Sequence, residues 1–318
     1  MSATDVHTGA WGGDPARKQA SIAAARAALA AGRAMTCIPA LRLSVAGQSD
    51  DPSNVYCEAY GTADLAELEA RAGLSASTLM LASAALCGCQ HWTRSGEGDR
   101  HIPGLVGGTK EAPIAALEAI RVGADPFTLT RNYVVDLLGH LATVRDNQGR
   151  CLTPEQQALV RQLATLHDAG CTDPARFREL RRTATAATDA ATGDLEGPIL
   201  RFVESVAWPL AGLSAELPEF VVYLHFDLRS LLAPESLSPA DQAMRDALWA
   251  LYEAAQEQFR ANPKFDIKAE LERIKSTPEF AAVNDPAFQD RVDHSELMEA
   301  EAYAPFATDL LTGAFRKA

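Results

Sequence analysis

A short polar residue followed directly by proline recurs along this chain of 318 residues. The polar side chain accepts hydrogen bonds from the unpaired N–H groups at a helix start, and proline at the first helical position has no N–H to leave unpaired. Each pair therefore predicts the start of an α-helix. The pairs are Asp14-Pro15, Asp125-Pro126, Thr153-Pro154, Asp173-Pro174, Ser238-Pro239, Thr277-Pro278 and Asp285-Pro286.

Glycines that follow alanine-, leucine- and arginine-rich runs predict where helices end, because a left-handed residue is favoured just past the last turn. These glycines are Gly32, Gly73, Gly123, Gly170 and Gly193. Starts and stops together predict helices near 15–31, 63–72, 76–89, 112–122, 126–146, 154–169, 174–192, 197–212, 218–233, 239–261, 266–276 and 286–303.

Extended character is confined to residues 37–45, interrupted by Pro39, and to residues 55–60. The sequence thus predicts an all-α fold: a single helical-bundle domain over 1–318, with about a dozen helices enclosing a cofactor pocket. Residues 1–60 are expected to form an N-terminal arm and an irregular segment within it.

The charge balance excludes several partners. With 29 basic and 42 acidic residues the net charge is −13, which repels nucleic-acid phosphates and anionic lipid. Residues 72–93 carry no charge, yet their serines, threonine and glycines make them too polar for a membrane span, so a buried core helix is expected there. No nucleic acid and no membrane partner is expected.

The cysteines and the N-terminus indicate a reducing compartment. The six cysteines form no C-x-x-C pair, and the first residues contain no apolar signal segment. We therefore expect a cytoplasmic protein with reduced cysteines.

One long connection, residues 90–111, is rich in glycine and contains His91, Trp92 and His101. Long loops in compact domains are usually functional or disordered, and the histidines and tryptophan favour function here. His91 follows an apolar helix and is a candidate acid or base at a cleft edge. An exposed loop histidine is an equally good interpretation of His91 and a better one of His101.

His225 lies in a predicted helix whose apolar residues share its face, so its imidazole needs a partner. One interpretation is a core histidine bonded to a carbonyl or an acid. The other is a ligand of haem iron, with Arg229 one turn later binding a haem propionate.

Arg131 stands early in the helix predicted over 126–146. An arginine can bind a substrate carboxylate with two parallel hydrogen bonds, or it can pair with a surface acid. Both interpretations of Arg131 stay open.

His140 and the pair His167-Asp168 form a competing pattern. Histidines on one helix and a His-Asp pair ending another resemble the metal site of HD-type phosphohydrolases. His167 is explained more simply as a residue that interacts with a helix C-terminus. The acidic segment 294–299 is interpreted as a solvated face, and the chain contains no nucleotide-binding, zinc-protease or serine-hydrolase motif.

At these residues the chain resembles the haem-dependent L-tyrosine hydroxylases of lincomycin- and anthramycin-type antibiotic pathways, which belong with the helical tryptophan 2,3-dioxygenase-like haem proteins. The similarity is strongest in the segments LCGCQHWTRSGEGDRHIPGLVGGTK, DPFTLTRNYVVDLLGHL and AELPEFVVYLHFDLRSLLA. The resemblance implies non-covalent haem b, hydrogen peroxide or dioxygen as oxidant, and ortho-hydroxylation of L-tyrosine to 3,4-dihydroxyphenylalanine.

Residue by residue, the resemblance implies His225 as the axial ligand of the haem iron and His91 as the acid or base beside the substrate phenol. It further implies Arg131 as the group that binds the substrate carboxylate, with Arg229 and Trp92 at the haem. The related dioxygenases are oligomeric, so a homo-oligomer is expected by resemblance alone. The alternatives are an HD-like metal-dependent phosphohydrolase and a non-enzymatic helical interaction or immunity protein.

Overall fold

The computed structural model describes residues 9–31, 55–82 except 63, 76, 77 and 80, 112–209 except 192, then 224, 227, 228, 231 and 232, and finally 236–317. Throughout these residues the regular structure is helical, which confirms the all-α fold class. No helix among the described residues combines the length and apolarity needed to cross a bilayer.

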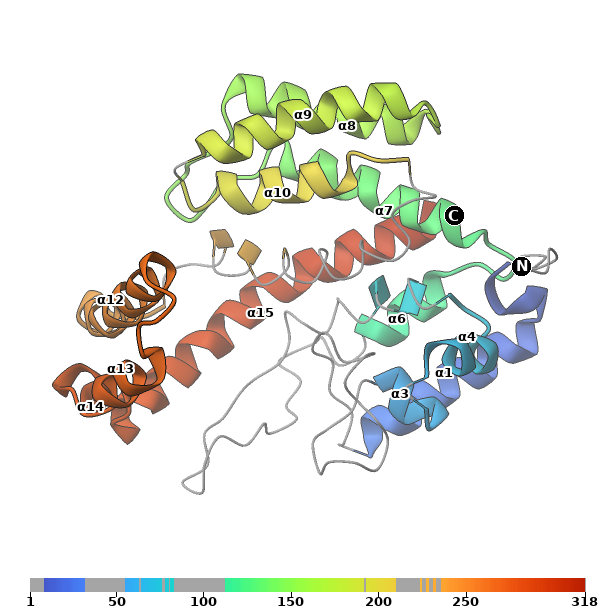
Figure 1. Cartoon of the computed structure of the whole chain (residues 1–318). Helices are drawn as coiled ribbons and strands as arrows, with labels where there is room; N and C mark the ends of the chain where they lie inside the picture. The colour runs from blue at the N-terminus through green and yellow to red at the C-terminus, as the bar shows by residue number, and fades with distance from the viewer. Residues whose placement is uncertain are drawn as a thin grey trace.

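Figure 1 shows the helices in their spatial arrangement. In chain order they are the 3-10 helix η1 (Ala10–Gly13), then α1 (Pro15–Ala30), α3 (Val55–Tyr60), α4 (Leu65–Ala72), α6 (Ala112–Ala119), α7 (Pro126–Leu141), α8 (Pro154–Asp168), α9 (Pro174–Ala190), α10 (Glu196–Val206), α12 (Pro239–Ala261), α13 (Ile267–Ile274), α14 (Pro278–Val283) and α15 (Pro286–Lys317).

The polar-proline pairs do begin helices. Asp14, Asp125, Asp173, Ser238 and Thr277 each accept a hydrogen bond from a first-turn N–H of the helix that follows. The other two caps are Asp285, which accepts from Ala287, and Thr153, which completes a capping box with Gln156.

The glycine stops are confirmed at three positions and wrong at one. Gly73, Gly123 and Gly170 have φ of 72°, 80° and 62°, the left-handed conformation expected past a helix. At Gly73 a Cβ would lie 2.9 Å from the Cα of Trp11, so only glycine fits. Gly193 is not left-handed, because α9 already ends at Ala190 and its cap residue Ala191 is extended. Gly32 lies outside the described residues.

Five parts of the helix prediction need correction. The helices expected over 126–146 and 197–212 end earlier, α7 at Leu141 and α10 at Val206. Val55–Tyr60, expected to be extended, is helix α3, whose first three residues are buried. The last helix was expected to end at 303 but continues through Pro305 to Lys317. Thr277-Pro278 begins a short helix, α14, which the predicted set of helices omitted. The expected extended segment 37–45 lies outside the described residues.

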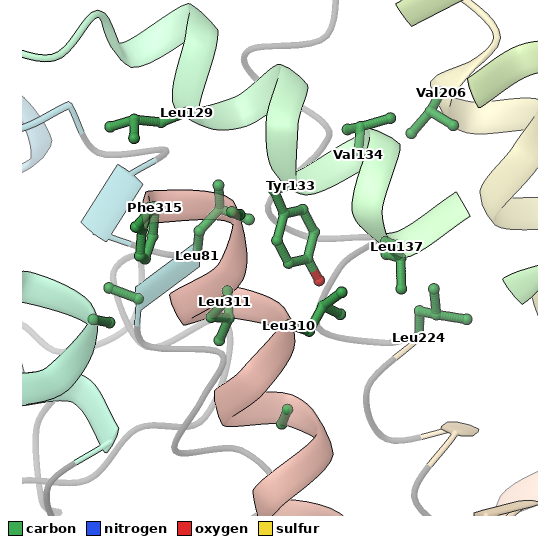
Figure 2. Close-up of a cluster of buried hydrophobic side chains, with 14 of the residues drawn as sticks. Leu81, Leu129, Tyr133, Val134, Leu137, Val206, Leu224, Leu310, Leu311 and Phe315 are labelled. Atoms are coloured by element: carbon green, nitrogen blue, oxygen red, sulfur yellow. The ribbon is translucent and has the colours of Figure 1, made fainter. Parts of the chain in front are cut away.

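The main hydrophobic core is built around α7. This helix packs against α8 and α10 and also against α15. Figure 2 shows part of the cluster, with the ring of Tyr133 extending from α7 toward Leu310 of α15. Tyr133, Leu137, Leu311 and Phe315 are all fully buried. One continuous apolar cluster therefore joins the N-terminal helices, α7–α10 and the second half of α15.

A second, smaller cluster holds α12, α13 and α14 together. Its buried members are Leu248, Ala255 and Ile274. These three helices lie at one end of α15, away from α8–α10 (Figure 1). We call them the α12–α14 unit. Asp241 of α12 and Arg291 of α15 form an ion pair of 2.7 Å that links the unit to α15.

Candidate functional site

Four of the predicted site residues fall outside the described residues: His91, Trp92, His225 and Arg229. The glycine-rich segment 90–111 and His101 lie outside them as well. The described site residues are Arg131, His140, His167 and Asp168, together with several neighbours of His225.

The segment that contains His225 is helical wherever it is described, at 224, 227, 228, 231 and 232. Leu224 is 3% exposed and Leu228 is fully buried, and both belong to the main core cluster. Leu231 and Leu232 pack against the same cluster. Figure 2 places Leu224 near the end of α7 that carries Leu137. Leu224 and Leu228 are therefore turned into the protein, and Leu231 and Leu232 are partly buried against the same core.

The segment also contains a partly buried acid, Asp227. Burial raises the pKa of its carboxyl, and the positive charge of Arg201 on α10 opposes that shift. Asp227 thus lies within electrostatic reach of Arg201 on α10.

The turn between α7 and α8 contacts this segment at Leu231. The backbone N–H of Asn147 donates to the carbonyl of Leu231 at 2.8 Å. Next to it the buried carboxylate of Asp146 accepts from the N–H groups of Gln148 and Arg150 and from Nε of Arg150. Although burial raises the pKa of Asp146, the hydrogen bonds from Arg150 and Gln148 prevail and the pKa is lowered.

His167 is a satisfied core histidine. The residue is 1% exposed, and its Nε2 lies 2.7 Å from the carbonyl oxygen of Val206. Because a carbonyl only accepts, Nε2 carries the hydrogen. Val206 is the last residue of α10, so His167 stabilises the C-terminus of a neighbouring helix. Burial lowers the pKa of His167, while the Val206 hydrogen bond opposes the shift.

Arg131 lies on the side of α7 that faces the turn between α8 and α9. A methyl group on Gly170 would lie 3.6 Å from Nη1 of Arg131. Arg131 is half-buried, and no carboxylate of the described residues lies within ion-pairing distance of its guanidinium. Arg131 and Tyr133 are separated by about 200° around the helix, so they point to opposite sides of α7.

His140 does not join His167 in a metal site. It is exposed in the last turn of α7, and its ring lies 5.4 Å from that of Phe306 in an edge-to-face arrangement. Asp168 is exposed at the end of α8. Among the described residues no group of three histidine, cysteine or acidic side chains is placed to bind a metal ion.

The turn at Asp146 was not predicted from the sequence. Its signal is the order Asp-Asn-Gln-Gly, since aspartate at the first position and glycine at the fourth are typical of a tight turn. The contact with Leu231 had no signal, because the two residues are far apart in the sequence.

The comparisons with known proteins give no relative. No family model matches the chain, and neither a curated protein nor a solved structure matches it significantly.

Proposed function

We propose that this protein is a haem-dependent aromatic oxygenase that hydroxylates L-tyrosine next to its phenol hydroxyl. The resemblance of three segments to the tyrosine hydroxylase family supports this function. The structural observation that supports it is that Leu228 is fully buried and Leu232 is partly buried against the main core, at positions three and seven after His225 in the sequence. An apolar, inward-facing helix surface suits a flat hydrophobic cofactor with one histidine ligand.

The proposal assigns a role to each residue. His225 would hold the iron, Arg229 would pair with a propionate and Trp92 would contact the porphyrin. Haem supplies the oxidising power when bound, and the protein contributes orientation and a dry pocket. His91 would accept and return the phenol proton.

Arg131 would bind the carboxylate of the amino acid. Arg131 suits this role because the residue is half-buried and no acid of the described residues pairs with its guanidinium.

Absorption spectroscopy tests the proposal. The protein purified with haem supplied is expected to show a Soret band, which His225→Ala should abolish and His91→Ala should leave in place while turnover falls roughly a hundredfold or more. His140→Ala is the matched control, because His140 is exposed and touches only Phe306 among the described aromatic rings. A colourless protein would overturn the function, and an unchanged band in His225→Ala would overturn the ligand assignment.

A further inference from the structure

Helix α12 carries a row of side chains that its own unit covers only in part. Asp241, Leu248 and Ala255 are buried and mark the face of α12 that is turned inward. Beside that face, spacings of four and three residues alternate, a pattern that places side chains in one row along an α-helix. We call this row the α12 stripe, and it consists of Arg245, Trp249, Tyr252, Gln256 and Phe259. Tyr252 is half-buried against the cluster of the unit, whereas the other four are exposed.

Two members of the stripe are exposed aromatic side chains. Trp249 is 62% exposed and Phe259 is 43% exposed. Large apolar side chains that are exposed on one helix face are typical of a binding surface, and tryptophan is among the residues that contribute most to binding. The α12 stripe is therefore a candidate interface at the end of α15 that lies away from α8–α10 (Figure 1).

Charges beside the stripe indicate what binds there. Asp246 and Arg260 are exposed, and each directly follows a stripe residue, so both lie along the same edge of it. Within the described part of the chain neither forms an ion pair. Asp246 accepts a hydrogen bond from Gln242, and Arg260 donates one to Gln256. One unpaired charge of each sign thus lies at either end of the exposed aromatic row.

We infer that the α12 stripe joins two copies of this protein as an antiparallel helix pair with two-fold symmetry. If Trp249 of one copy lies opposite Phe259 of the other, Asp246 of each copy comes within reach of Arg260 of the other. The aromatic rings then pack on one another, and opposite charges meet at both ends of the contact. In a parallel pair Asp246 and Arg260 would stay about 21 Å apart along the helix axis, too far to interact.

Sedimentation velocity at increasing protein concentration tests the association. A contact of one helix per copy is small, so we expect a weak monomer–dimer equilibrium with a Kd on the order of 10–100 µM. Trp249→Ala should weaken it roughly tenfold or more. Met298→Ala is the matched control, because Met298 is 45% exposed but lies on α15, outside the stripe, and its loss should change nothing. Circular dichroism establishes that the variants are folded.

Charge substitutions test the antiparallel arrangement. Asp246→Arg alone and Arg260→Asp alone each bring like charges together at both ends of the pair, so each variant should self-associate roughly tenfold more weakly than the wild type. A mixture of the two variants should associate again, because one copy then carries two arginines at these positions and the other carries two aspartates. The double variant, which exchanges the two charges within one chain, should also associate like the wild type.

The results separate the parts of the inference. A wild type that stays monomeric over the whole concentration range overturns it, and the stripe would then be a surface for a different partner. Unchanged association of Trp249→Ala overturns the assignment of the interface to the α12 stripe. A mixture that associates no better than the single variants overturns the antiparallel pairing. None of these outcomes depends on haem, so the proposed function is tested separately.

Discussion

Two regions of the molecule are both helical but are stabilised differently. One is the α12–α14 unit, and the other, which we call the body, consists of the helices that share the main core cluster: η1 to α10 and the second half of α15. The body buries Tyr133, Phe202 and Phe315 completely in one extensive cluster. In the α12–α14 unit only Leu248, Ala255 and Ile274 are buried in the shared cluster, and Trp249 on α12 is 62% exposed.

Ion pairs occur in both regions, and three of them lie in the unit or at its junction with α15. Arg273 pairs with Glu270, Lys275 with Glu272, and Arg291 with Asp241. Ion pairs with at least one exposed partner contribute little individually, whereas buried apolar area scales directly with stability. The comparison indicates that the body sets the global stability and that the unit opens first.

The largest effect is expected from truncating a core phenylalanine in the body. Phe315→Ala should lower the free energy of unfolding by about 3–5 kcal/mol, because the side chain is fully buried and leaves a cavity. Phe280→Ala in the α12–α14 unit is the matched change, and it should cost clearly less because Phe280 is only half-buried. Chemical denaturation followed by circular dichroism measures both. Equal losses would show that the unit is as important for global stability as the body.

An intermediate effect is expected from pH. Burial lowers the pKa of His167, so the unfolded chain takes up a proton first as the pH falls below the ordinary value of 6.5. The body should therefore lose stability from that pH downward, by about 1.4 kcal/mol for each unit by which the native pKa is lowered. His167→Gln keeps a donor for Val206 but has no titrating group. Its unfolding free energy should change less between about pH 7 and pH 5 than that of the wild type.

In the α12–α14 unit the stability is expected to change with pH only at lower, acidic pH values. The hydrogen bonds from Arg291 lower the pKa of Asp241 below the ordinary 3.8, so this contribution is present above that value and is lost as the pH falls through the native pKa. An identical acid dependence of the two regions would contradict this assignment.

The smallest effect should come from Asp241→Asn, which weakens the pair with Arg291 at the junction of the unit with α15. We expect hydrogen exchange to become a few-fold faster in the first turns of α12 and to stay constant in α8. Asp136→Asn, which removes the partner of Lys317 in the body, is the control and should leave α12 unchanged. Faster exchange throughout the chain would show that the two regions unfold together.

Helix starts were predictable because capping is local chemistry. Thr153 and Gln156 satisfy each other's backbone groups within one turn, so four residues contain the whole signal. The start of α12 at Pro239 and its end at Ala261 agree with the expected limits.

The predictions of secondary structure are wrong where tertiary packing outweighs the local conformational preference of the residues. Val55–Tyr60 has the composition of a strand, yet it forms a helix that packs against α1. Pro305 should favour a helix end, yet α15 continues because Leu310, Leu311 and Phe315 beyond it pack into the main core.

The sequence by itself determined the all-α class and the helix starts, since both follow from side chains acting on their own backbone within a few residues. Only the tertiary structure decided the long-range contacts. His167 hydrogen-bonds to Val206, and the N–H of Asn147 donates to the carbonyl of Leu231. The guanidinium of Arg131 lies beside Gly170. Those contacts join residues distant in the chain, and helix packing, rather than any local spacing, brings them together.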